Sequence, residues 1–221
     1  MTFQFNTVFE YWPMYLEGLR TTIYVTLGSL IFSLILSIPL AMIKITKNKI
    51  LNFIGFLYTD IFRALPSLVQ IYLVYFAAPQ LFGITFTAMT SAFITLSMNA
   101  AAYISEALRG GILSVDIGQR EAAKALGISQ VDTLKDIVLP QALKAVFPSM
   151  INETIGLLKG TSMVSIIGVV DLMRASRQVM ADSYLSFEPL MVAAVIYYIL
   201  VKSMSMIGNR LEKRIRVSEI R

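Results

Sequence analysis

Two long stretches of the chain carry no charged side chain. Thr21–Ile43 is 23 residues long, and Ala64–Ser105 is 42 residues long. A helix rises about 1.5 Å per residue, so about 20 apolar residues cross a hydrocarbon core of about 30 Å. The first stretch is therefore long enough for one transmembrane helix and the second for two. A turn at 77–85, where Pro79 and Gly83 favour a reversal, would separate those two.

Composition agrees with a membrane protein. Of the 221 residues, 56% are hydrophobic and 15% are charged, against about 45–50% and 25% in soluble domains. We therefore expect an all-α membrane protein that forms a single transmembrane domain over residues 1–221. Its five transmembrane helices are expected at about 21–43, 64–78, 86–105, 143–159 and 187–207.

Lysine and arginine are distributed unequally between the segments that join these spans. Fourteen lie in three segments on one side: Lys44, Lys47, Lys49, Arg63, Arg109, Arg120, Lys124, Lys135, Lys144, Arg210, Lys213, Arg214, Arg216 and Arg221. Three lie on the other side: Arg20, Arg174 and Arg177. Cytoplasmic loops carry the excess of basic residues, which predicts a cytoplasmic C-terminus and an N-terminus outside. This asymmetry explains the net charge of +5 without a nucleic-acid partner.

The chain contains no cysteine and no histidine. Cysteine nucleophiles, histidine-based triads and thiolate metal sites are therefore excluded. The phosphate-binding motif Gly-x-x-x-x-Gly-Lys-Ser/Thr is also absent from the sequence. We expect no catalytic residues, no metal site and no enzymatic activity of the chain itself.

The longest charged stretch, residues 109–140, separates the third and fourth spans. Its residues predict two short helices with a sharp corner between them. Gly127 suits the left-handed residue that closes the first helix, and Ser129 followed by Asp132 suits the start of the second. Pro140 is expected to end that second helix.

One motif in this stretch resembles the signature loop of binding-protein-dependent ABC importer permeases. The matching residues are Glu121, Ala122, Ala123, Gly127, Ile137, Leu139 and Pro140. Two flanking segments, Phe62–Gln70 and Leu157–Gly168, are similar to the polar amino-acid branch, which includes histidine, glutamine, arginine and cystine permeases. We call residues 109–140 the coupling loop.

The resemblance implies a type I ABC importer permease fold in a multi-pass protein of the prokaryotic cell (inner) membrane. The motif residues would then be the ATPase-coupling residues. The complex would contain two ABC ATPase subunits, which would bind the permease through this loop. These subunits rather than this chain would bind ATP and Mg. The other implied partners are the lipid bilayer, a second permease subunit (an identical copy or a close paralogue), and an extracellular or periplasmic substrate-binding protein.

Three alternatives stay open at this point. The loop could be an amphipathic connector that only packs on its own helix bundle. The chain could also be a secondary amino-acid transporter or a channel that works without an ATPase, or a scaffold that takes no part in transport.

Two ionisable residues fall within the fourth span, where a charge costs at least about 2.5–3.5 kcal/mol. Glu153 and Lys159 are six residues apart, which corresponds to about 9 Å of rise and about 120° around the helix. They cannot pair directly, so each needs another partner. A zwitterionic substrate supplies both, with its carboxylate at Lys159 and its ammonium or basic side chain at Glu153. The alternative is that they pair with other spans or reach towards water.

Three further residues are candidates for the substrate site. Thr161 and Ser162 follow Gly160, where the helix is expected to be interrupted, and interrupted helices often line transport sites. Asn99 is a polar residue in the uncharged third span. An interhelical hydrogen bond is the alternative role for Asn99. The expected substrate is a polar amino acid, with a basic one favoured.

Overall fold

The computed structural model describes residues 3–217, and every regular element in that range is helical. The long helices are α2 (Trp12–Ile45), α6 (Ala88–Ser114), α9 (Leu139–Gly160) and α11 (Phe187–Val217). The shorter ones are α1 (Phe5–Phe9), α3 (Lys49–Ala64), α4 (Ser67–Tyr72), α5 (Ala78–Phe82), α7 (Ile117–Ala125), α8 (Gln130–Asp132) and α10 (Leu172–Ser183). Two π-helical segments, η1 (Leu73–Ala77) and η2 (Thr133–Val138), and the 3-10 segment η3 (Thr161–Ile167) complete the order. The expected all-α class is confirmed.

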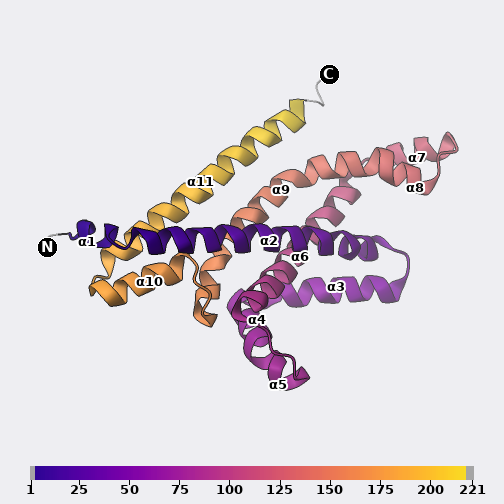
Figure 1. Cartoon of the computed structure of the whole chain (residues 1–221). Coiled ribbons are helices and arrows are strands. Elements are labelled where there is room, and N and C mark those ends of the chain that lie inside the picture. The colour runs from indigo at the N-terminus through magenta and orange to yellow at the C-terminus, as the bar shows by residue number, and fades with distance from the viewer. Residues whose placement is uncertain (1–2, 218–221) are drawn as a thin grey trace.

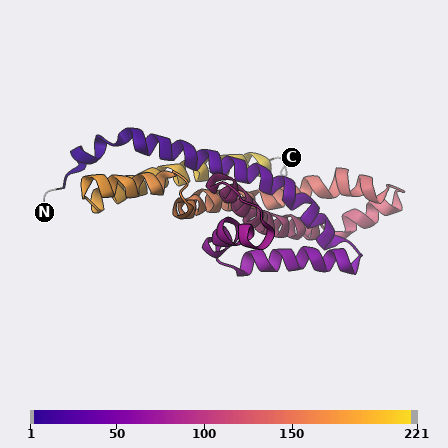
Figure 2. The ribbon, with the colours of Figure 1, turned by 60° about the horizontal axis from the view of Figure 1, so that its bottom comes forward.

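The helices form an elongated molecule (Figures 1 and 2). Helix α2 runs along much of its length, with α1 and α10 at the end that carries the N-terminus. The turn between α2 and α3 lies at the opposite end, together with α7 and α8. The α2–α3 turn and the α7–α8 region belong to two of the three basic segments, and they lie at the same end of the molecule. This agrees with the expectation that both lie on one side of a membrane.

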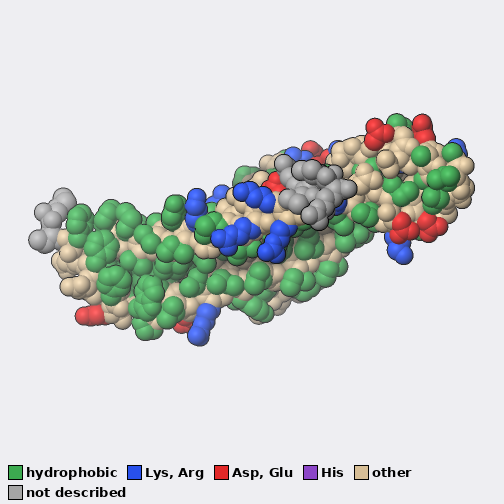
Figure 3. Space-filling model, turned by 90° about the horizontal axis from the view of Figure 1, so that it is seen from above, with side chains coloured by type: hydrophobic (Ala, Val, Ile, Leu, Met, Phe, Trp, Pro, Cys, Tyr) green, Lys and Arg blue, Asp and Glu red, His purple; other side chains and the backbone are tan. Residues whose placement is uncertain are grey.

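Helix α2 buries small polar residues and exposes large apolar ones. Ser29, Ser33 and Ser37 are fully buried, whereas Phe32 and Ile35 are exposed. Small residues let transmembrane helices approach closely, and large apolar side chains face lipid favourably. Figure 3 shows the result on one face of the molecule, where hydrophobic side chains cover a broad area. Such a surface suits a bilayer.

Two helices are long and apolar enough to cross a membrane alone, namely α2 and the part of α11 at Phe187–Ile215. Two bent pairs reach this criterion together: Lys49–Ala64 with Ser67–Phe82, bent by 106°, and Gln130–Ile167 with Leu172–Ser183, bent by 49°. Within residues 3–217 the structure thus supports two to four spans. The count of five and the orientation of the termini stay predictions.

The helix bounds differ most from the expected spans around residues 64–78. A span is expected to start there, but the structure has the break between α3 and α4 at this point. Pro66 explains it, because a proline disfavours helical geometry at the preceding residue, and Leu65 is extended with ψ 136°. The side-chain amide of Gln70 donates to the Phe62 and Leu65 carbonyls, both at 2.8 Å. These bonds satisfy two carbonyl groups that the break leaves free.

The coupling loop follows two of the three local expectations. Gly127 has φ +73° and closes α7, with the Ile128 N–H donating to the Ala123 carbonyl at 3.0 Å. Ser129 Oγ accepts from the Asp132 N–H at 3.1 Å and so begins the next helix. The expectation that Pro140 ends this helix is wrong, because α8, η2 and α9 continue without a break in helical geometry.

The π-helical segment η2 explains why the helix continues through Pro140. A proline inside an α-helix lacks the N–H for an i→i−4 bond, and its ring collides with the carbonyl of residue i−4. Here Pro140 sits in the first turn of α9, directly after the wider turn of η2. A π-bulge interrupts the regular i→i−4 hydrogen-bond pattern within a helix, so a proline there need not break the helix. Residues 130–160 therefore form one long helical run.

Candidate coupling loop and translocation site

The end of the molecule formed by α7 and η2 exposes apolar side chains. Ile117 is 70% exposed, Leu126 78% and Val131 73%. Glu121 and Ala122 are also exposed, whereas Ala123 is buried. Because exposed apolar and charged side chains lie together at this end, it is a candidate interaction surface.

The motif residues fall into two groups on the two sides of the Gly127 corner. Glu121, Ala122 and Ala123 lie on α7, while Ile137, Leu139 and Pro140 lie on η2 and at the start of α9. A cleft of about 470 Å³ lies between α7 and η2, and it is lined by Ile117, Arg120, Glu121, Lys124, Ile128, Gln130, Thr133, Leu134 and Val138. Glu121 therefore lines this cleft together with two cationic residues, Arg120 before it and Lys124 after it in the sequence.

Contacts with α6 and α9 fix α7 and η2 to the helix bundle. Arg120 Nη2 donates to the Ile112 carbonyl at 2.6 Å and so joins α7 to the end of α6. Ile112, Val138 and Ala142 form a small buried cluster with Val115 between α6, η2 and α9. These contacts hold the exposed face of α7 in one orientation.

Glu153 and Lys159 both lie on α9, but they point to different sides of it. Glu153 shares a helical stripe with Met150 and Leu157, which pack against the core between α2 and α6. Lys159 borders a groove formed with α10 and α11. Neither side chain makes a hydrogen bond or an ion pair with any described residue, 3–217. Both ionisable groups are thus left without a counter-charge within this part of the chain.

A single glycine lies midway between these two charges. Gly156 is three residues from each of them, so the three residues form an inclined i, i+3, i+6 ridge that turns about 60° around the helix at each step. A Cβ atom at Gly156 would have no neighbour within 4 Å. The surface of α9 between Glu153 and Lys159 is therefore open at Gly156 in the structure of this chain.

The groove beside Lys159 has a volume of about 450 Å³, and its other lining residues are Ser162, Met173, Leu190, Ala193, Ala194 and Tyr197. Tyr197 donates from its hydroxyl to Asp171 Oδ2 at 3.3 Å, and Asp171 is fully buried. The sequence analysis missed both residues. The isolated acidic residue after the uncharged run 160–170 is the signal that could have found Asp171.

The three remaining candidates differ in how their polar atoms are used. Thr161 is fully buried and donates to the Leu158 carbonyl at 2.7 Å. Ser162 is half-buried in the groove beside Lys159 and donates to its carbonyl at 2.8 Å. The α-helix does end at Gly160, as expected, and continues as the 3-10 segment η3.

Asn99 lies at the break between α3 and α4 rather than beside Lys159. Its amide nitrogen donates to the Phe62 carbonyl at 3.2 Å and to Gln70 Oε1 at 3.1 Å. The interhelical hydrogen bond, which is the alternative role of this residue, is thus present. In the described part of the chain no group of three or more acidic, histidine or cysteine side chains could hold a metal ion.

Comparison with known proteins gives concordant results. A Rickettsia bellii protein named as a glutamine transport system permease is 44% identical over 202 residues, which are 91% of this chain and 93% of the relative. The arginine transport system permease protein of Bacillus subtilis is 39% identical over 219 residues, which are 99% of this chain and the whole of the relative. A crystal structure of an amino acid ABC transporter with histidines contains a chain with a TM-score of 0.91 and 32% identity. That match covers 97% of this chain and 100% of the other.

The profile of one protein family matches residues 33–217, and its description is binding-protein-dependent transport system inner membrane component. The match includes the coupling loop and α9 with both of its ionisable residues. It covers most of the chain, and it agrees with the resemblance indicated by the loop motif. The chain therefore belongs to the inner membrane components of binding-protein-dependent transport systems.

Proposed function

We propose that this chain is a permease subunit that forms half of the translocation pathway of an ATP-driven importer for a polar amino acid, with a basic one favoured. One observation carries the proposal: Glu153 and Lys159 lie on the same membrane helix and have no partner among residues 3–217. Two unpaired charges of opposite sign in a membrane helix are costly unless a ligand or another chain supplies counter-charges. A zwitterionic substrate supplies both of them.

In this proposal Lys159 binds the α-carboxylate, which all amino acids share. Ser162 and Tyr197 border the same groove and offer polar atoms beside it. Glu153 binds the ammonium group or the basic side chain at the other end of the substrate. The open space at Gly156 gives the substrate a place between the two charges. Thr161 and Asn99 are assigned a supporting role, because Thr161 is fully buried and Asn99 lies at the break between α3 and α4 rather than beside Lys159.

The coupling loop is the proposed docking site for an ATPase subunit, of which the complex contains two. Support comes from its exposed apolar residues and from its attachment to α6 through Arg120. The ATPase subunits bind ATP and Mg, and this chain has no enzymatic activity or cofactor. The remaining proposed parts are a second permease subunit, identical or closely related, and a substrate-binding protein outside the cell membrane. Five spans with the N-terminus outside complete the proposed topology.

The test is purification of the chain with the products of neighbouring genes, followed by reconstitution into lipid vesicles. We expect ATP hydrolysis that a panel of polar amino acids stimulates, and uptake that vanadate blocks. Uptake driven by an ion gradient, without ATP and with no effect of vanadate, would show a secondary transporter instead. Substitution Glu121→Arg tests the loop separately: full ATP-driven uptake by this variant would refute its coupling role.

A further inference from the structure

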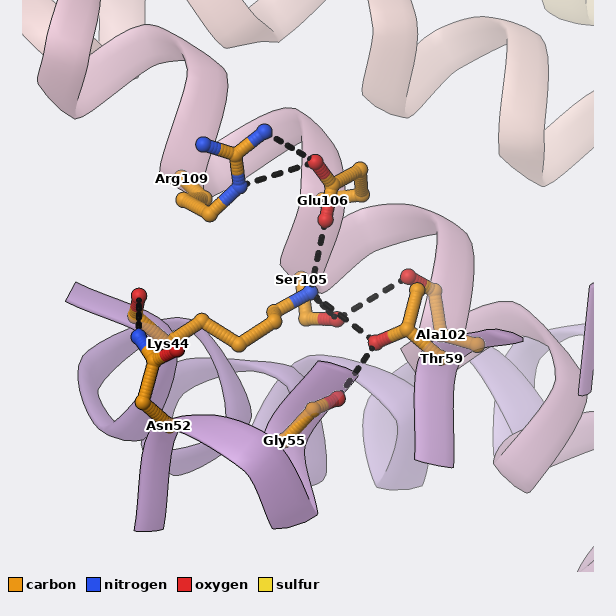
Figure 4. A network of polar contacts seen from close by, with 8 residues as sticks. All are labelled: Lys44, Asn52, Gly55, Thr59, Ala102, Ser105, Glu106 and Arg109. Atoms are coloured by element: carbon orange, nitrogen blue, oxygen red, sulfur yellow. Dashed lines mark hydrogen bonds and ion pairs between the residues drawn. The ribbon is translucent and has the colours of Figure 1, made fainter. Parts of the chain in front are cut away.

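Lys44 is buried, although the sequence places it among the basic residues that flank the first span. It lies at the end of α2 and is 3% exposed. Its ammonium group donates to Thr59 Oγ1 at 3.0 Å, to Ser105 Oγ at 2.9 Å and to Glu106 Oε2 at 3.0 Å (Figure 4). An ammonium has three N–H donors, so all three are used. These acceptors come from α3 and α6.

Glu106 extends the contact to a third charge. Its other carboxylate oxygen accepts from Arg109 through Nε at 2.8 Å and through Nη2 (Figure 4). The Arg109 guanidinium also lies 5.5 Å from the centre of the Phe56 ring of α3. We call Lys44, Glu106 and Arg109 the charge cluster. It joins α2, α3 and α6 at one level of the molecule.

The surrounding backbone is shaped to admit this cluster. A Cβ atom at Gly55 would lie 2.7 Å from Lys44 Cγ, so the glycine gives the lysine stem its space. Asn52 donates from its side chain to the Lys44 carbonyl at 2.6 Å and thereby caps the end of α2. All three donors of Lys44 are used, and its stem fits the space left by Gly55, so the cluster is a specific arrangement and not a chance surface ion pair.

The charge cluster reaches into the coupling loop, because Arg109 is the first residue of that loop. Only residues 110–116 separate Arg109 from the start of α7 at Ile117. That stretch is itself held in place, since Arg120 of α7 donates to the Ile112 carbonyl and Gly111 packs closely on α9. Any displacement of α7 therefore reaches the cluster through a short, packed segment.

We propose that the charge cluster positions the coupling apparatus, so that a displacement of α7 moves α2 and α3 together with α6. This inference rests on the proposed coupling role of the loop. Buried ion pairs often add little stability compared with apolar residues, but they can specify one arrangement of the elements they join. In the absence of the cluster, α6 would move with α7 while α2 and α3 lag behind, and hydrolysis would no longer be converted into transport.

The test uses the complete complex in lipid vesicles and measures amino-acid uptake per ATP hydrolysed. The main variant is the double substitution Lys44→Met with Glu106→Gln, which removes two charges together and leaves none buried alone. Arg109 can then reach water, because its side chain is 26% exposed. We expect the assembled complex to hydrolyse ATP but to transport at least about tenfold less per ATP, within the usual range of coupling between sites.

A matched control is Tyr58→Phe, which removes another hydrogen bond between the same helices. The Tyr58 hydroxyl donates to the Met98 carbonyl at 2.7 Å without any charge. Uptake per ATP should stay unchanged in this variant. An unchanged ratio in the double variant would overturn the inference, and so would failure of the double variant to assemble, because the cluster would then serve folding alone. Glu121→Arg, measured in parallel, separates the coupling role of the loop from the positioning role of the charge cluster. If Glu121→Arg lowers uptake per ATP while the double variant does not, only the role of the charge cluster is refuted.

Discussion

At the scale of single residues, the carboxylate of Glu153 offers the sharpest test of the substrate site. Glu153→Gln keeps the size of the side chain and removes its charge. A hydrogen bond to a charged group contributes about 1.5–3 kcal/mol, so we expect uptake of arginine to fall at least about tenfold. Uptake of glutamine should fall less. Labelled uptake into vesicles measures both, and equal losses would indicate a structural carboxylate.

Lys159 provides the complementary test at the other end of the ridge. Lys159→Met keeps the length of the side chain and removes the cation that is proposed to bind the carboxylate. Because every amino acid has that carboxylate, uptake of arginine and glutamine should fall to a similar extent, by about tenfold. The assembled complex, followed by size-exclusion chromatography, should be unaffected, because Lys159 has no partner among the described residues. Unchanged uptake would remove Lys159 from the site.

Gly156 tests whether the space between these charges is used. Replacement by Ala and then by Val fills that space in steps, and neither should disturb folding, since a Cβ there meets nothing within 4 Å. We expect uptake to decrease from Gly to Ala to Val while the amount of assembled complex stays constant. If Gly156→Val transports normally, the substrate does not lie along this ridge.

At the scale of secondary-structure elements, Gly127 sets the angle between α7 and the long helical run that follows. Its φ of +73° costs a β-branched residue about 1–2 kcal/mol, whereas asparagine tolerates this conformation. Gly127→Val should therefore weaken binding of the ATPase subunits and lower ATP-driven uptake, and Gly127→Asn should do so much less. Copurification and uptake measure the two effects. Equal behaviour of the two variants would show that the corner does not depend on this backbone conformation.

Elements governed by local rules could be predicted from the sequence, and those governed by tertiary contacts could not. The Gly127 corner and the Ser129 cap depend on neighbouring residues alone, and both are present. Proline usually ends a helix, and the sequence pattern does not reveal the π-helical turn that lets this helix continue through Pro140. In the sequence Lys44 resembles the other basic residues that flank a span. Only the fold brings Ser105 and Glu106, which are 61 and 62 residues away, into contact with it. For the same reason the Tyr197–Asp171 pair became visible only in the fold.

At the scale of the whole molecule, α11 leaves much apolar surface uncovered. Val195, Tyr198 and Ile199 are exposed on it, and within residues 3–217 only 6% of its most apolar stretch is buried. Lipid or a second permease subunit can cover this face. In the single chain Gly156 is exposed, so the ridge is open on one side, which is why the proposed pathway needs a second half to enclose it.

The sequence contains no cysteine, so single-cysteine variants can test the membrane topology directly. Single cysteines can replace Lys47, exposed between α2 and α3, and Ser186, exposed between α10 and α11. These two loops lie at opposite ends of the molecule (Figure 1), and the excess of basic residues predicts that the first is cytoplasmic. A membrane-impermeant maleimide added to intact cells should label Ser186→Cys at once, but Lys47→Cys only after the membrane is opened. The reverse pattern would invert the proposed orientation, and labelling of both in intact cells would contradict the span count between them.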